Sequence, residues 1–192
     1  MLTKKILKLE FEGRLQWFRL FSFIMILGVM SLVLSLFFLT SFKVVFADTK
    51  AGVVTGLQIP RYVTTKKSKV FVRRGPGQKY KIDWIYQSSG YPFKVKAEFD
   101  HWRQIEDFQG EGGWVHFRLI SGKRSVVIVK NGTLLRRKAA FKSGSVASIN
   151  YGAVARLISA NMDWCYVSIQ GLEGWVLKTN VWGIMENEII NN

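Results

Sequence analysis

Residues 70–80, VFVRRGPGQKY, join a strand pattern to a turn pattern. Side chains alternate between the two faces of a strand, so Val70 and Val72 are expected to point into a core and Phe71 outward. The Gly-Pro-Gly at 75–77 is typical of a turn, because glycine tolerates positive φ and proline fixes φ at about −65°. This stretch therefore predicts a short strand that ends in a tight turn.

Short runs of β-branched and aromatic residues continue on both sides of that stretch. They occupy residues 69–72, 84–86, 93–97, 102–105 and 113–115. Turn-forming residues separate them at 75–77, 88–90 and 109–112. Strands spaced about 8–12 residues apart indicate an all-β sandwich or barrel. No long helix is expected after residue 48, since no helical periodicity of useful length occurs there.

The pattern occurs twice along the chain. Residues 102–105 (Trp-Arg-Gln-Ile) precede a Gly-Trp-Val at 113–115, and residues 164–167 (Trp-Cys-Tyr-Val) precede a Gly-Trp-Val at 174–176. Upstream, residues 90–95 match residues 152–157. A copy of about 60 residues is small for a stable domain. We therefore expect each copy to close into a barrel, which removes exposed strand edges, and the two copies to pack together.

The first copy resembles the bacterial SH3-like (SH3b) domain family. Residues 70–80 are similar to its V-x-V-R-x-G-P-x-x-x-Y signature, and residues 102–105 and 113–116 are similar to its W-x-x-V and G-W-V-H segments. The second copy has Lys-Ala-Ala at 138–140 in place of the Gly-Pro-Gly turn. The resemblance, with Val-Trp-Gly at 181–183, implies the tandem type found in exported alphaproteobacterial proteins. Those proteins often pair a cysteine with one placed like Cys165, but Ala160 stands at about the partner position here.

We therefore predict an all-β fold of two tandem small SH3-like β-barrels, preceded by an N-terminal hydrophobic signal or anchor helix. The expected organisation is a signal peptide or signal anchor at 1–47, a linker at 48–58, a first barrel at 59–121, a second, degenerate barrel at 122–183 and a tail at 184–192.

The N-terminal residues have the order of an export signal. Residues 1–19 have a net charge of +3, and residues 20–42 contain no charged side chain. A helix of that apolar length covers about 35 Å, which is enough to cross a bilayer. Residues 45–47, Val-Phe-Ala, form an acceptable cleavage pattern, but the apolar run is longer than in most cleaved signals. Cleavage after Ala47 and an uncleaved inner-membrane anchor both stay open, and both predict an exported, periplasmic position for the remaining residues.

The charge of the chain is strongly positive. The whole sequence has a net charge of +15, and residues 48–192 keep 22 Lys and Arg against 11 Asp and Glu. Such a field favours anionic partners, including an anionic membrane surface. Nucleic acid is not expected as a partner of an exported protein. Nothing in the pattern indicates an oligomeric state.

The sequence predicts no catalytic, metal or cofactor site. Cys165 is the single cysteine, and we expect it to be a small buried side chain, with pairing to another chain as the alternative. The carboxylate pairs Glu98/Asp100 and Glu106/Asp107 are expected to be solvated. His101 and His116 lack the paired spacing of a metal site and are expected to be ordinary surface residues. A phosphate-binding loop is also absent from the sequence.

Aromatic and basic residues are interspersed in the first copy, which is the pattern of a binding surface. The predicted ligand-binding residues are Tyr62, Arg73, Arg74, Tyr80, Trp84, Tyr86 and Tyr91. Aromatic faces suit sugar rings and peptide stems, and guanidinium groups suit carboxylates. The leading hypothesis is a non-enzymatic exported module that binds cell-wall peptidoglycan or a wall-associated peptide. The alternative is a structural protein that binds an envelope protein or, if secreted, a host protein. A wall hydrolase is a third reading that we do not expect.

Overall fold

The computed structural model of the 192-residue chain describes Met25, Met30 and residues 50–191. The predicted signal or anchor at 1–47 lies outside the described residues except for those two methionines. Among the described residues, no helix is both long and apolar enough to cross a membrane. Residues 50–191 belong to one compact unit.

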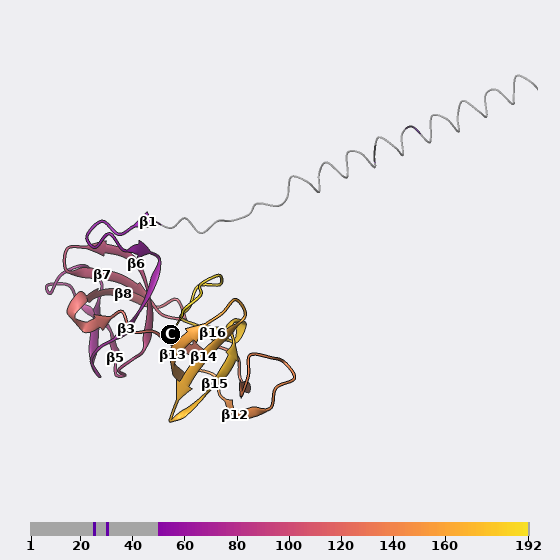
Figure 1. Ribbon diagram of the computed structural model, residues 1–192. Helices are drawn as coiled ribbons and strands as arrows, with labels where there is room; N and C mark the ends of the chain where they lie inside the picture. Colours follow the sequence, from indigo (N-terminus) through magenta and orange to yellow (C-terminus); the bar gives the residue numbers. More distant parts are fainter. Residues whose placement is uncertain (1–24, 26–29, 31–49, 192) are drawn as a thin grey trace, which may run out of the picture. The chain divides into compact units, whose positions relative to one another are not determined.

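A two-stranded ribbon, β1 (Lys50–Ala51) and β2 (Gln58–Ile59), precedes the first of two seven-stranded antiparallel sheets (Figure 1). We call residues 61–121 the first repeat. Its strands are β3 (Arg61–Thr65), β4 (Val70–Arg73), β5 (Ile82–Tyr86), β6 (Pro92–Phe99), β7 (Trp102–Glu106), β8 (Gly112–His116) and β9 (Ile120–Ser121), with the 3-10 helix η1 (Phe117–Leu119) between the last two. The order across the sheet is β5-β4-β8-β7-β6-β3-β9.

The second repeat, residues 125–182, follows the same path through its own sheet. Its strands are β10 (Ser125–Ile128), β11 (Thr133–Arg136), β12 (Ser145–Ile149), β13 (Val154–Ala160), β14 (Trp164–Ile169), β15 (Leu172–Leu177) and β16 (Val181–Trp182), with η2 (Lys178–Asn180) before the last. The order is β12-β11-β15-β14-β13-β10-β16, which matches the first sheet strand for strand. The predicted duplication and the mostly β fold are therefore confirmed.

The sheets are not closed by hydrogen bonds. Within the described residues the first sheet ends at β5 and β9, and the second at β12 and β16, with no ladder joining the ends. The expectation of fully closed barrels is wrong in that respect. β9 and β16 are only two residues long, and very short edge strands limit unwanted pairing with other chains.

Each repeat has its own hydrophobic core. Val70 and Val72 are fully buried whereas Phe71 and Arg73 are half-buried, so the alternation predicted for 70–73 is confirmed. The first core gathers around Phe93, and the second around Leu135 and Val167. Deep burial of branched side chains is the main stabilising contribution that units of this size possess.

The glycines of the two Gly-Trp-Val segments allow close contact between strands. A Cβ atom on Gly113, where φ is +149°, would lie 2.5 Å from the carbonyl oxygen of Arg73. A Cβ atom on Gly174 would lie 2.7 Å from the carbonyl oxygen of Arg136. β8 therefore pairs with β4, and β15 with β11, only because a side chain is missing at these positions.

The two repeats contact each other through aromatic and polar groups. The rings of Tyr62 and Trp182 meet edge to face at 5.1 Å, and the Arg124 guanidinium lies 5.6 Å from the centre of the Tyr62 ring. The Ser125 hydroxyl donates a hydrogen bond to the Gly90 carbonyl oxygen at 2.5 Å. Of these residues, Gly90, Arg124 and Ser125 also line a cleft between the two repeats.

Candidate functional site: an aromatic groove on the first repeat

Three of the predicted ligand-binding tyrosines take part in packing: Tyr86 and Tyr91 in the first repeat, and Tyr62 at the contact between the repeats. Tyr86 meets Phe93 edge to face at 4.7 Å, and its hydroxyl donates to Asp107 at 2.9 Å. Tyr91 packs against both rings of that pair. Burial raises the pKa of Tyr91 to about 12, and burial together with the hydrogen bond to Asp107 also raises the pKa of Tyr86. Their role in ligand binding stays a prediction, and the structure gives them a role in the core.

Tyr62 lies away from the other predicted residues. It is 9% exposed and lies between Trp182 and Arg124, where burial raises its pKa to about 12. The Tyr62 ring therefore helps to hold the two repeats together. The structure does not bring Tyr62 together with Tyr80 or Trp84.

The remaining four predicted residues lie on β4, β5 and the connection between them. Arg73 Nη1 donates to the carbonyl oxygen of Tyr80 at 2.7 Å, so Arg73 holds this connection in place. The Arg74 guanidinium donates two hydrogen bonds to Asp83, which raise its pKa. Tyr80 and Trp84 are the exposed aromatic residues of this group.

The turn signature has a steric basis. A Cβ atom on Gly75 would lie 2.6 Å from the Tyr80 ring, so glycine lets the tyrosine lie flat on the turn. In the second repeat Arg136 Nη1 donates to the carbonyl oxygen of Ser143 at 2.7 Å, which repeats the contact of Arg73. The arginine contact is thus kept although the Gly-Pro-Gly turn is not.

A groove of about 360 Å³ opens beside Arg73 on the outer face of the first repeat. We call it the aromatic groove; its lining residues are Phe71, Arg73, Gln78, Trp102, His116, Arg118 and Leu119. Trp102 and His116 meet edge to face at 5.5 Å. Two guanidinium groups, an amide and three aromatic side chains therefore line the same groove, a combination that suits carboxylates and apolar stems.

His116 lines the groove in surroundings that disfavour its protonated form. Burial, with the neighbouring His101 and Arg118 side chains, lowers its pKa. Its Nδ1 accepts a hydrogen bond from the Arg118 backbone N–H at 3.3 Å, which caps η1. The ring of His101 lies 5.9 Å away, and the described residues contain no group of three side chains able to hold a metal ion.

The second repeat has a smaller groove at the same place. It has a volume of about 190 Å³ and includes Leu134, Arg136, Trp164 and Leu177 among its lining residues. Strand register places Leu134 at the position of Phe71 and Leu177 at the position of His116. The arginine and tryptophan are kept, and the other aromatic groups are replaced by leucine.

Sequence reasoning identified only Arg73 of the aromatic groove as a ligand-binding residue. It missed Phe71, Gln78, Trp102 and His116, together with Arg118. The available signal was the outward position of Phe71 and Arg73 on one strand, which places both side chains on one surface. The approach of Trp102 and η1 to that surface depends on sheet order, which local patterns do not reveal.

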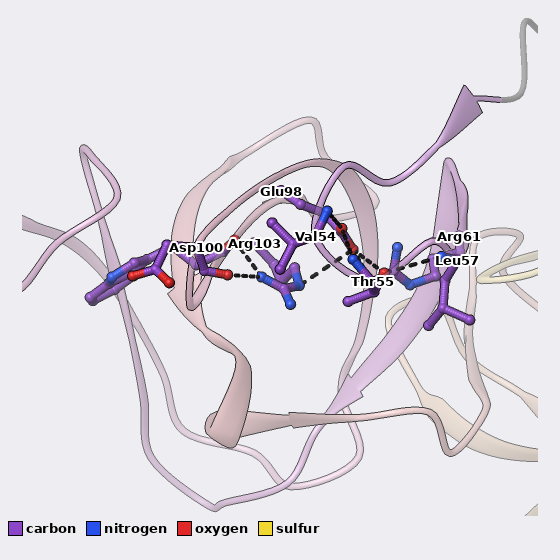
Figure 2. A network of polar contacts seen from close by, with 8 residues as sticks. Val54, Thr55, Leu57, Arg61, Glu98, Asp100 and Arg103 are labelled. Atoms are coloured by element: carbon purple, nitrogen blue, oxygen red, sulfur yellow. Dashed lines mark hydrogen bonds and ion pairs between the residues drawn. The ribbon is translucent and has the colours of Figure 1, made fainter.

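The expectation that both carboxylate pairs are solvated is wrong for Glu98. Its side chain is fully buried and accepts hydrogen bonds from the Thr55 hydroxyl at 2.7 Å and from the backbone N–H groups of Val54 and Thr55 (Figure 2). Arg61 Nη2 lies 2.7 Å away and Arg103 Nε 3.5 Å away. Burial alone would raise the pKa of Glu98, but the hydrogen bonds from Thr55, Arg61 and Val54 outweigh it and lower the pKa to about 2.

Asp107 is also buried, and it caps a turn. Its carboxylate accepts from the backbone N–H groups of Gln109 and Glu111 as well as from the Tyr86 hydroxyl. The other residue of each pair lies nearer to solvent: Asp100 is exposed, and Glu106 pairs with Lys96. Glu98 and Asp107 have their oxygens occupied by donors, so both fix the fold and neither is placed as an acid or base.

Cys165 is buried in the second core, as predicted. It is 0% exposed, and burial raises the pKa of its thiol to about 11. A thiol of this kind is protonated at neutral pH and is a poor nucleophile.

Two curved antiparallel sheets of the same strand order, each with a groove beside its second strand, define a tandem of small SH3-type domains. The chain belongs to the family described as "Bacterial SH3 domain", which it matches over residues 66–122 and 128–183. This match covers SH3 domains, and no catalytic domain is evident in it.

Comparison with solved structures gives weaker similarity. NlpC2 of Trichomonas vaginalis is 8% identical with a TM-score of 0.30, over 64% of this chain and 48% of NlpC2. NlpC1 of the same organism is 9% identical with a TM-score of 0.29, over 68% of this chain and 48% of NlpC1. The chain thus spans about half the length of these two proteins. No curated protein gives a significant match.

Proposed function

We propose that this protein is a non-enzymatic binding module of the cell envelope whose aromatic groove holds a peptide of cell-wall peptidoglycan. The observation that carries the proposal is the gathering of Phe71, Trp102 and two arginines around one groove. SH3-type domains use aromatic-lined grooves for extended peptides, and membership of the bacterial SH3 family supports the same use here.

The chemistry of the groove supports a peptide that carries carboxylates. Arg118 is exposed, with its guanidinium 5.8 Å from the centre of the Phe117 ring, whereas Arg73 is held in place by its contact with Tyr80. Two guanidinium groups that line one groove can both donate hydrogen bonds to a carboxylate. Gln78 offers a donor and an acceptor to a peptide backbone. The aromatic side chains of the groove remove the apolar parts of a peptide from water.

The position in the cell is part of the proposal. The basic and apolar residues at 1–42 support an export signal or inner-membrane anchor. In either case residues 48–192 would meet the cell wall in the periplasm. Their net charge of +11 would favour an acidic wall polymer.

The test is co-sedimentation of the full chain, in a neutral detergent, with purified sacculi. The groove variant is Phe71→Ala/Arg118→Gln. The matched control is Leu134→Ala/Arg137→Gln, because Leu134 is the outward residue equivalent to Phe71 and Arg137 is an exposed arginine outside the grooves. Both variants lose one charge and one outward apolar side chain.

We expect the wild type and the control to sediment with sacculi and the groove variant to lose about tenfold in affinity. Equal retention of the groove variant and the control would contradict the proposed site. Retention of the wild type no better than that of an unrelated protein of the same charge would contradict the proposed ligand. Release of wall fragments on incubation would contradict the absence of catalysis.

A further inference from the structure

A second cavity, which we call the basic cleft, lies between the two repeats and has a volume of about 390 Å³. Both repeats and the connection between them line it. The lining residues are Thr64, Thr65, Lys66, Ser89, Gly90, Ser121, Lys123, Arg124, Ser125, Val154 and Arg156. Four of these residues are cationic and five carry hydroxyl groups, and no acidic residue of the described chain is among them.

Two of the cations have no counter-charge among the described residues. Lys66 and Lys123 are both exposed, and neither makes a described side-chain hydrogen bond or ion pair. Arg124 is paired with Glu188, and Arg156 lies 3.5 Å from Glu173 with both side chains largely exposed. The cleft therefore concentrates positive charge that the protein itself does not balance.

Strand pairing places the two lysines around one pair of hydroxyl groups. Thr64 on β3 pairs with Ser121 on β9, and their hydroxyl oxygens are 3.2 Å apart. Lys66 follows β3 directly, and Lys123 lies in the connection that leaves β9.

The hydroxyl pair keeps a donor for a ligand. Thr64 is 3% exposed and Ser121 is half-buried, and each has one hydroxyl hydrogen. When one hydroxyl donates to the other, the hydrogen of the acceptor remains free. The other two buried hydroxyls of the cleft are occupied: Thr65 donates to the Ser88 carbonyl oxygen, and Ser125 donates to the Gly90 carbonyl oxygen.

We propose that the basic cleft, with Lys66, Lys123, Arg156 and the Thr64–Ser121 hydroxyl pair, binds a phosphate group. A carboxylate offers two oxygens and one charge, whereas phosphate offers three or more oxygens and up to two charges. Several separate cations and a hydroxyl donor match the oxygens and charges of a phosphate better than those of a carboxylate. Lysine binds phosphate as a point charge. This site is separate from the aromatic groove and does not depend on the proposed function.

The phosphate has two chemical sources, the free ion and the phosphodiester of a lipid headgroup. The probes are therefore inorganic phosphate and glycerophosphoglycerol, the deacylated headgroup of phosphatidylglycerol. Succinate serves as a dianion with carboxylates. Binding to the full chain is measured by calorimetry in neutral detergent micelles at constant ionic strength.

The cleft variant is Lys66→Gln/Lys123→Gln, and the matched control is Lys67→Gln/Lys142→Gln. All four lysines are exposed, and the control residues lie outside the cleft, so the variants have equal charge and an intact core. Thr64→Val is a third variant, which replaces the buried hydroxyl with a methyl group and so removes one member of the hydroxyl pair.

We expect phosphate or glycerophosphoglycerol to bind the wild type and the control alike, and the cleft variant about tenfold more weakly. Thr64→Val should weaken binding severalfold. The probe that binds more tightly identifies the source. Absence of binding by both phosphate probes, equal weakening in the cleft variant and the control, or equally tight binding of succinate would overturn the proposal.

Discussion

Glu98 and Arg103 lie directly opposite each other on β6 and β7, at the register that Ala160 and Cys165 occupy on β13 and β14. The first repeat thus has a buried ion pair where the second has two small apolar side chains. Glu98 also binds Arg61 and the backbone of Val54 and Thr55. The pair therefore connects the ribbon of β1 and β2 to the first repeat, whereas the matching position in the second repeat belongs to its core.

The Glu98 contacts predict a pH dependence of stability. Because folding lowers the pKa of Glu98 from 4.5 to about 2, its ionised form stabilises the fold above pH 4.5. This contribution, about 3 kcal/mol, is lost as the pH falls from 4.5 toward 2. Urea unfolding, monitored by tryptophan fluorescence, should show that Glu98→Gln is much less stable than the wild type at pH 6. Near pH 2 the two proteins should have nearly equal free energies of unfolding.

The exposed pair of Lys96 and Glu106 supplies the control for that experiment. Surface ion pairs contribute about 0–1 kcal/mol, so Glu106→Gln should change the free energy of unfolding little at either pH. A Glu98→Gln effect as small as that of Glu106→Gln would contradict the buried network.

Gly113→Ala and Gly174→Ala should both destabilise the protein by about 1–3 kcal/mol. Each added methyl group would meet a backbone carbonyl oxygen at 2.7 Å or less, so β4 and β8, or β11 and β15, must separate. Thermal unfolding measures the effect. Gly122→Ala and Gly144→Ala are the controls, since their added methyl groups meet no atom within 4 Å. If all four variants unfold at the same temperature, the steric account of the Gly-Trp-Val segments is wrong.

Cys165 should be inert in the folded protein. Its thiol is 0% exposed with a pKa of about 11, so a thiolate is rare at pH 8 and a reagent has no access. A colorimetric disulfide reagent should label the native chain very slowly and the chain in concentrated guanidinium chloride fully. Rapid labelling of the native chain, or a disulfide-linked dimer on a non-reducing gel, would instead support pairing between chains.

Most of the fold could be predicted from the sequence. The alternation at 70–73, the spacing of turns and the two Gly-Trp-Val segments are local signals, and each corresponds to an observed strand or turn. The closure of the sheets could not be predicted, because the pairing of end strands depends on curvature that local patterns do not contain.

The candidate site was harder to predict, since aromatic residues serve both cores and surfaces. Tyr86 and Tyr91 have the composition of a binding surface, but Tyr86 on β5 packs against Phe93 on β6, and local patterns do not reveal a contact between two strands. Glu98 was expected to be solvated because its hydrogen-bond partners at 54–61 lie about 40 residues away along the chain. Burial of a polar side chain depends on such distant donors, and sequence spacing alone does not supply them.

The most direct measurement of the central claim is a titration of the full chain with soluble peptidoglycan fragments, observed through the indole N–H signals of its tryptophans by NMR. The account predicts that Trp102 responds first, and that its response is lost in Phe71→Ala/Arg118→Gln but kept in Leu134→Ala/Arg137→Gln. A response confined to tryptophans outside the aromatic groove, or one that is unchanged in the groove variant, would contradict it.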